Sequence, residues 1–104
     1  MVKLHGRWCG PNWTDGRAQD ATAYKANGGN FRGRATDPLD KICRTHDKSC
    51  SGANGCSVRG NLAMVRSIDR FLANPANGVR YPSAYLKAPL IKAGILAATP
   101  FVGR

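Results

Sequence analysis

Apolar residues recur at helical spacing in two consecutive segments in the middle of the chain. The first segment begins at Asp37, which can cap a helix, and Pro38, which suits the first helical position. Turn residues at positions 51–55 end this predicted helix. One face of it carries Leu39, Ile42, Cys43, His46 and Cys50.

The second segment follows directly, with Asn54 or Ser57 as candidate caps, and the turn residues at 74–78 end it. Because the connection between the two segments is short, we expect antiparallel neighbouring helices. The apolar face of the second helix is broad and carries Val58, Leu62, Met64, Val65, Ile68, Phe71 and Leu72.

The remaining chain has weaker patterns. Residues 82–99 are apolar, but Pro89 interrupts them, which predicts two short helices at 84–86 and 90–96. Residues 5–36 are rich in glycine, asparagine and basic side chains with little apolar periodicity, which predicts a long loop. No segment has a good strand signal, so we predict a mainly α fold held by disulfides.

The length of 104 residues is that of a single domain, taken here as residues 1–104. No run of about 18 apolar residues occurs, so no transmembrane helix is expected. The first residues lack the apolar segment of a signal peptide. A secreted form of the protein would therefore have lost its signal.

The charge is strongly unbalanced, with 16 lysines and arginines against 6 acidic residues and a net charge of +10. Such a surface attracts an anionic partner, which can be a membrane, a heparin-like polymer or a nucleic acid. A basic stripe with interleaved aromatic residues is missing from every element, so a binder of nucleic acids or other polyanions is the least favoured interpretation.

Four cysteines, which allow three different pairings, stand at Cys9, Cys43, Cys50 and Cys56. Two disulfides would indicate an oxidising compartment. The alternative is four reduced thiols in a cytosolic protein. A zinc site is a weak interpretation, because no cysteine lies in a CxxC motif and the sequence has only two histidines.

Candidate chemistry lies at His46 and Asp47, adjacent residues of the first predicted helix. Their side chains point about 100° apart, so they cannot form a hydrogen-bonded pair and must act differently. Neutral histidine is the usual general base near neutral pH. A carboxylate together with backbone carbonyls of a glycine-containing loop, such as residues 6–13, suits a Ca²⁺ ion.

The segments Trp8-Cys9-Gly10 and Cys43-Arg44-Thr45-His46-Asp47 together resemble the calcium loop and the catalytic helix of the secreted phospholipase A2 family. The resemblance covers about a quarter of the chain. It implies a phospholipase A2-like fold of two antiparallel, disulfide-linked helices with a calcium-binding loop. It also implies a Cys9–Cys43 disulfide, which leaves Cys50 to pair with Cys56. Relative to the family, residues 13–36 are an insertion, whose Asp15 and Asp20 could perturb or supplement the metal site.

The resemblance assigns a role to each matching residue. His46 would be the general base that takes a proton from the attacking water, and Asp69 on the second helix would orient it. An alternative for Asp69 is a solvated helix pair with Arg66 or Arg70. Ca²⁺ would be bound by the Asp47 carboxylate and by the backbone carbonyls of Trp8, Gly10 and Asn12. Asn12 stands where the family has glycine, and asparagine tolerates the left-handed backbone.

The predicted function is a calcium-dependent phospholipase A2 that hydrolyses the sn-2 ester of glycerophospholipids at an anionic bilayer. We expect a secreted monomer, as in a toxin or effector, with no nucleic-acid partner. One alternative is a non-catalytic module of the same fold that binds a membrane or a receptor. Another is a basic binder of polyanions or nucleic acids, whose binding would be salt-sensitive and independent of calcium.

Overall fold

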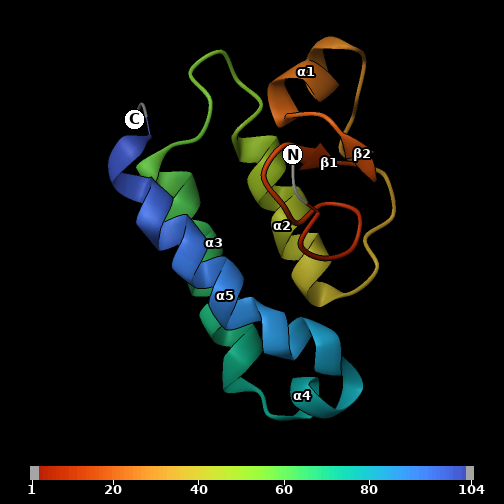
Figure 1. Ribbon diagram of the computed structural model, residues 1–104, viewed down its shortest axis with the longest axis vertical. Coiled ribbons are helices and arrows are strands. Elements are labelled where there is room, and N and C mark those ends of the chain that lie inside the picture. Colours follow the sequence, from red (N-terminus) through yellow and green to blue (C-terminus); the bar gives the residue numbers. More distant parts are fainter. Residues whose placement is uncertain (1–2, 103–104) are drawn as a thin grey trace.

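Three helices form the body of the protein in the computed structural model, which describes residues 3–102 (Figure 1). They are α2 (Pro38–Ser49), α3 (Val58–Ala73) and α5 (Pro82–Ala98). The shorter elements are β1 (Trp13–Thr14), β2 (Arg17–Ala18), α1 (Ala21–Ala26), α4 (Ala76–Arg80) and the 3-10 helix η1 (Thr99–Phe101). The mainly α prediction is confirmed.

The helices α2 and α3 run antiparallel, as the short connection predicted (Figure 1). The side chain of Asp37 caps α2 by accepting a hydrogen bond from the backbone N–H of Asp40, and Ser57 caps α3 by accepting from Gly60. Both caps were among those predicted from the sequence. The third long helix, α5, packs on α3 and runs back along it, so its end lies near the start of α3.

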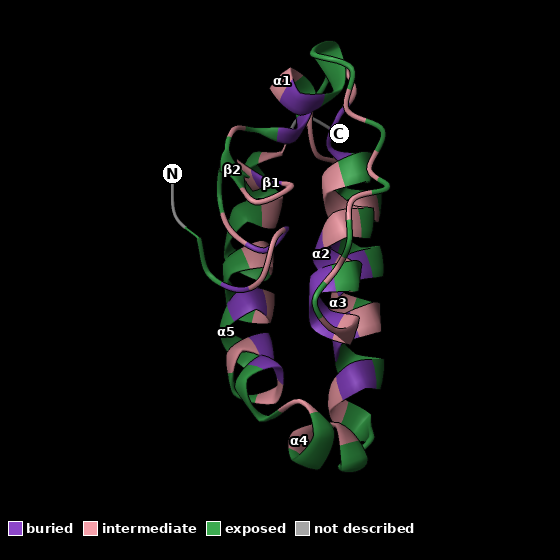
Figure 2. Ribbon diagram, turned by 90° about the vertical axis from the view of Figure 1, so that its right-hand side faces the viewer, coloured by how far each residue is buried: buried purple, intermediate pink, exposed green. Residues whose placement is uncertain are grey.

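One prediction about α5 is wrong, because the helix is continuous through Pro89. Proline removes one backbone hydrogen bond and normally kinks or ends a helix. Here the side chains of Ala84, Ala88 and Ile91 are buried, and their packing offsets the lost hydrogen bond, although the helix changes direction along its length (Figure 1). The burial pattern along α2, α3 and α5 is visible in Figure 2.

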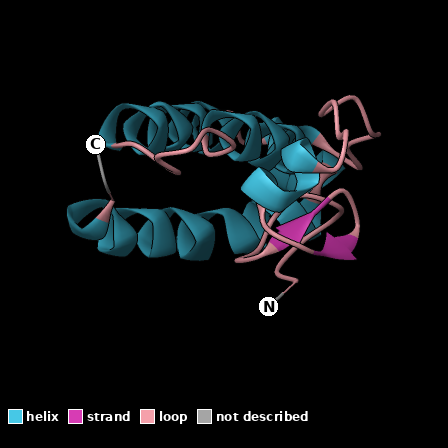
Figure 3. Cartoon of the chain, turned by 90° about the horizontal axis from the view of Figure 1, so that it is seen from above, coloured by secondary structure: helices cyan, strands magenta, loops and turns pink. Residues whose placement is uncertain are grey.

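The segment predicted to be a long loop contains a short antiparallel hairpin, β1–β2, and the helix α1. Asp20 caps α1 by accepting from the backbone N–H of Ala23. Aromatic rings give this segment a small core, with the Tyr24 ring 5.8 Å from Trp8 and 4.8 Å from Phe31. Figure 3 shows the strands at one edge of the helical body.

The main core forms where these aromatic residues meet the helices. Trp8, Leu39 and Ile68 are completely buried. Trp8 is therefore a core residue and not part of a membrane-facing rim. Within residues 3–102, no helix combines the length and apolar character needed to cross a bilayer.

Candidate active site

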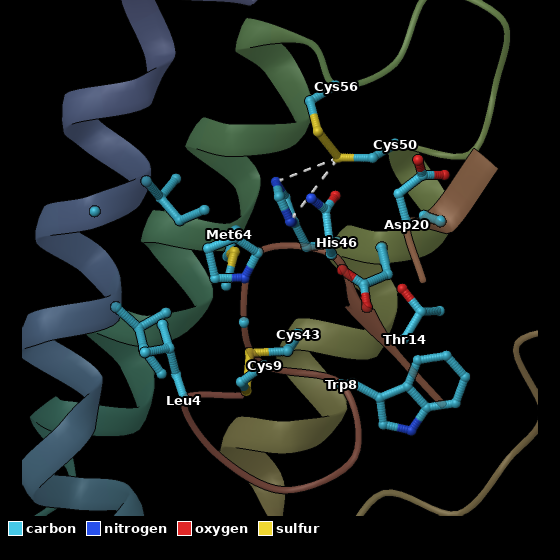
Figure 4. Close-up of a pocket in the computed structure, with 18 of the residues that line it drawn as sticks. Leu4, Trp8, Cys9, Thr14, Asp20, Cys43, His46, Cys50, Cys56 and Met64 are labelled. Atoms are coloured by element: carbon cyan, nitrogen blue, oxygen red, sulfur yellow. Dashed lines mark hydrogen bonds between the residues drawn. A yellow bond between two sulfur atoms is a disulfide. The ribbon is translucent and has the colours of Figure 1, made fainter. Parts of the chain in front are cut away.

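A cavity of about 550 Å³ lies between α2, α5 and the N-terminal loop. His46 and Asp47 line it from α2, and residues 8–12 line it from the loop. Much of the remaining wall is apolar and includes Leu4, Met64, Leu90, Ile91, Ile95 and Ala98. His46, Asp47 and the predicted loop residues therefore meet at one apolar cavity, part of which is drawn in Figure 4.

Two disulfides build the frame of this cavity. Cys9 pairs with Cys43 and joins the loop to the middle of α2. Cys50 pairs with Cys56 and joins the end of α2 to the segment before α3. Both pairings implied by the resemblance are present.

A buried carboxylate holds the loop against α2. Asp40 has no exposed surface and accepts hydrogen bonds from the backbone N–H groups of Arg7, Trp8 and Thr36, at 3.0, 2.8 and 2.9 Å. Gly6 has φ +59°, and a Cβ there would lie 2.5 Å from Asp40, so glycine is required at this approach. Asp40 is thus a structural carboxylate.

The four predicted calcium ligands, Trp8, Gly10, Asn12 and Asp47, all line the cavity. Asn12 has φ +52°, in the left-handed region that asparagine tolerates better than most residues. The Gly10 carbonyl accepts a hydrogen bond from Trp13 at 3.2 Å, which leaves it a second lone pair. The loop therefore has the left-handed backbone at Asn12 that asparagine tolerates, and it lines the same cavity as Asp47.

The Asp47 side chain is partly buried, and one of its two oxygens lacks a hydrogen bond. Its Oδ2 atom is inaccessible and has no hydrogen-bond partner among the described residues. Burial, followed by the nearby charge of Asp40, raises the pKa of Asp47 to about 8. A buried, unpaired carboxylate is costly unless a cation or hydrogen bonds satisfy it. A hard cation held by Asp47 and the loop carbonyls fits this donor set of oxygens.

His46 belongs to a chain of hydrogen bonds whose direction can be deduced from its end. The Ile95 carbonyl can only accept, so the Thr99 hydroxyl donates to it at 2.7 Å. The Thr99 oxygen then accepts from the Asn61 amide Nδ2 at 3.2 Å, which turns Asn61 Oδ1 toward His46. The 2.7 Å contact between this oxygen and His46 Nε2 requires a proton on Nε2.

The neutral His46 ring therefore carries its lone pair on Nδ1. This is the nitrogen that can act as a base or bind a metal. Burial lowers the pKa of His46, and the Asn61 hydrogen bond opposes this shift. The neutral form is the one favoured in the folded chain.

The expected contact between Asp69 and His46 is not present. Asp69 is half-exposed on α3, and its Oδ1 accepts a hydrogen bond from Lys92 at 2.6 Å. Asn61, two turns earlier on α3, occupies the orienting position. The reason is helical geometry, because Asn61 shares the buried stripe with Met64 and Ile68, whereas Asp69 follows Ile68 and points away from it.

Asn61 and Thr99 belong to the site although the sequence patterns did not indicate them. The available signal was the position of Asn61, since a polar amide three residues before Met64 and seven before Ile68 lies on an apolar stripe. A buried amide in that place needs hydrogen-bond partners. For Thr99, we find no local signal in the sequence.

The two acidic residues of the 13–36 segment have separate structural roles. Asp15 accepts a hydrogen bond from Arg7 at 2.6 Å and another from the Tyr24 hydroxyl at 3.3 Å. Asp20, which caps α1, lines the cavity as well. Of these two, only Asp20 is in a position to supplement a cation site.

Comparisons with known proteins do not add to this geometry. No protein-family model, no curated protein and no solved structure matches the chain.

Proposed function

We propose that the protein is a calcium-dependent phospholipase A2. The observation that carries the proposal is the meeting of His46, with its lone pair on Nδ1, and Asp47, with its unpaired buried oxygen, at one apolar cavity. A general base, a site for a hard cation and an apolar cavity are what calcium-assisted hydrolysis of a lipid ester requires. The resemblance of the loop and α2 to the secreted phospholipase A2 family supports the same assignment.

In the proposed mechanism, His46 Nδ1 takes a proton from a water molecule that attacks the ester carbonyl. Asn61 holds the Nε2–H, which keeps the ring in the reactive tautomer and orientation. The carboxylate of Asp47 and the carbonyls of Trp8, Gly10 and Asn12 would hold Ca²⁺. This ion would supply Lewis-acid stabilisation of the negative charge that develops on the carbonyl oxygen.

The substrate class follows from the cavity wall and the charge. The apolar side chains of Met64, Ile91 and Ile95 suit an acyl chain. At the cavity, Leu90 of α5 is 74% exposed, and Lys87 lies on the same helix. Together with the net charge of +10, these features favour an anionic bilayer as the surface on which the protein acts. The two disulfides support a secreted protein.

Fatty-acid release from vesicles containing anionic lipid, with Ca²⁺ or with a chelator, tests the proposal. We expect calcium-dependent release by the wild type and a loss of about 10²–10⁴-fold in His46→Ala, the contribution typical of a general base. Asp47→Asn should abolish the calcium-stimulated part of fatty-acid release. The matched change Asp69→Asn on the protein surface should leave release unchanged. No release by the folded wild type at any calcium concentration would exclude the enzyme.

One observation favours the alternative of a non-catalytic membrane-binding module. The partner of His46 Nε2 is the neutral amide of Asn61, so among residues 3–102 no carboxylate is hydrogen-bonded to the ring to stabilise the imidazolium that forms when His46 accepts a proton. A module of this kind would bind anionic vesicles without releasing fatty acid in the same assay.

A further inference from the structure

The Cys50–Cys56 disulfide lies directly against the His46 ring (Figure 4). The Cys50 sulfur is 3.6 Å from Nε2 and 4.0 Å from Nδ1 of His46. One ligand-type atom from each of His46, Cys50 and Cys56 can be chosen so that all three lie within 4.8 Å of one another.

Local structure brings these three side chains together. His46 and Cys50 are four residues apart at the end of α2, so their side chains are neighbours on one face. The turn at 51–55 brings Cys56 back to them. One imidazole and two cysteine sulfurs are a ligand set typical of Zn²⁺ sites with three protein ligands and an open fourth position.

While the disulfide is intact, this set cannot bind zinc, because the thiolate is the metal ligand and a disulfide offers none. The two disulfides differ in accessibility. Cys9 and Cys43 are 1% and 2% exposed, whereas Cys56 is only partly buried, next to the turn. A thiol reagent can therefore reach the sulfur of Cys56 more easily than either sulfur of the Cys9–Cys43 pair.

We propose that reduction of Cys50–Cys56 by a dithiol creates a Zn²⁺ site formed by His46 Nδ1 and the sulfurs of Cys50 and Cys56. A thiolate of the dithiol attacks the Cys56 sulfur, forms a mixed disulfide and releases the Cys50 thiolate. The second thiol of the reagent then attacks its own sulfur in the mixed disulfide. It leaves as a cyclic disulfide and releases the Cys56 thiolate. Both cysteine thiolates and the neutral imidazole are then available to the metal.

The hydrogen-bond chain of the site favours this metal site. Asn61 Oδ1 holds the proton on Nε2, which leaves Nδ1 as the ligand. A ligating histidine commonly donates its other N–H to an oxygen in this way. If the proposed function is correct, zinc occupies the lone pair that His46 needs as a base. The intact disulfide would then keep His46 available, and a reducing, zinc-containing compartment would inactivate the enzyme.

The experiment measures metal binding and does not depend on activity, so its failure is distinct from failure of the proposed function. The full chain is treated with a limiting dithiol, and peptide mapping verifies that Cys9–Cys43 is intact. After removal of the reagent, Zn²⁺ is added and the bound metal is quantified, with Co²⁺ as a spectroscopic probe. We expect one tightly bound Zn²⁺ in the reduced chain and none in the oxidised chain. Sulfur-to-cobalt charge-transfer absorption should appear only after reduction.

Two variants separate the three ligands from simple opening of the turn. His46→Ala, reduced in the same way, should bind zinc more than about 100-fold more weakly than the wild type. This loss is larger than the one that usually follows when a residue that only hydrogen-bonds to a metal ligand is removed. The double variant Cys50→Ala/Cys56→Ala has the same open turn without thiols and should bind no zinc. The proposal is overturned if the reduced wild type, with both thiols titratable, holds no zinc, or if His46→Ala binds equally well. Loss of helical circular dichroism on reduction that zinc does not restore would overturn it too.

Discussion

Asp47 and Asp69 show how differently one residue type behaves in two places on neighbouring helices. Asp69 is half-exposed and paired with Lys92, an arrangement that contributes about 0–1 kcal/mol at a surface. Asp47 is partly buried, and its inaccessible Oδ2 has no hydrogen-bond partner among the described residues, so its charge is costly in the absence of a cation. The difference makes Asp47 the residue whose protonation should be visible in the stability of the whole chain.

Without calcium, we expect the free energy of unfolding to fall as the pH rises from about 4 to about 8, because of Asp47. The folded chain keeps a proton on Asp47 up to a pKa of about 8, whereas the unfolded chain loses it near 3.8. Over that window the unfolded state binds fewer protons, so stability declines with pH. Thermal unfolding of wild type and Asp47→Asn at several pH values measures the effect.

Two comparisons isolate the contribution of Asp47. His46, with its lowered pKa, destabilises the fold below pH 6.5, but it is present in both proteins and its effect cancels in the difference. Saturating Ca²⁺ should remove the decline in the wild type and leave Asp47→Asn unaffected. The same pH slope in both proteins without calcium would contradict the assignment.

The elements meet at two buried polar connections, each of which joins segments distant in sequence. Asp40 ties α2 to the loop at residues 6–8 and to Thr36. The series of hydrogen bonds from His46 through Asn61 to Thr99 joins α2 to α3 and to the end of α5. Because hydrogen bonds have direction, these connections set the orientation of side chains as well as the distance between helices.

Replacing Asp40 with alanine should lower the free energy of unfolding by at least about 2 kcal/mol, because several buried backbone N–H groups lose their acceptor. Calcium affinity should fall too, since the loop is no longer held against Asp47. Urea denaturation and calcium titration measure the two effects. Asp69→Ala is the matched control, for which we expect a change within about 1 kcal/mol.

The Asn61→Asp variant should raise the pKa of His46 by about 1 unit or more, because a carboxylate partner favours the imidazolium. Titration of the His46 ring signals by NMR in calcium-free solution measures this shift. The exposed Asn74→Asp change, also near α3, should leave the pKa of His46 unaltered. An unchanged pKa in Asn61→Asp would show that Asn61 does not hold the ring in solution.

At the scale of the whole molecule, charge and exposed apolar surface act together. The net charge of +10 acts over the entire surface, whereas Leu90 and its neighbours on α5 are apolar side chains at the cavity. Attraction to an anionic bilayer is long-ranged and sensitive to salt, and insertion of leucine into the bilayer is short-ranged and insensitive to it. The two contributions can therefore be measured separately.

We expect Leu90→Ser to weaken binding to anionic vesicles about tenfold, since burying a leucine side chain contributes roughly 1.5–3 kcal/mol. Val79→Ser is the control, because Val79 is 84% exposed but lies on α4 and does not line the cavity. Vesicle sedimentation at several salt concentrations measures both variants. Equal losses in the two variants would show that α5 is not the membrane-facing element.

The local features of this protein could be predicted from the sequence because neighbouring residues determine them. Asp37, Pro38 and Ser57 mark helix starts, and the apolar periodicity defines α2 and α3. The resemblance of two short segments supplied the disulfide pairing and named calcium ligands that line one cavity with His46 in the structure. Short-range sterics, caps and spacing act the same way in any fold, so they can be recognised in a sequence met for the first time.

Only the tertiary structure decided which polar residue holds His46, what Asp40 does and how α5 continues through Pro89. Asp69 was the expected partner of His46, but the packing of α3 buries Asn61 and leaves Asp69 at the surface. Thr99 lies 53 positions after His46 in the sequence. Its hydrogen bond with Asn61 extends the series that begins at His46, and no local pattern encodes this contact. These features depend on distant segments being buried together, where an unpaired polar group is costly and a packed helix tolerates a proline.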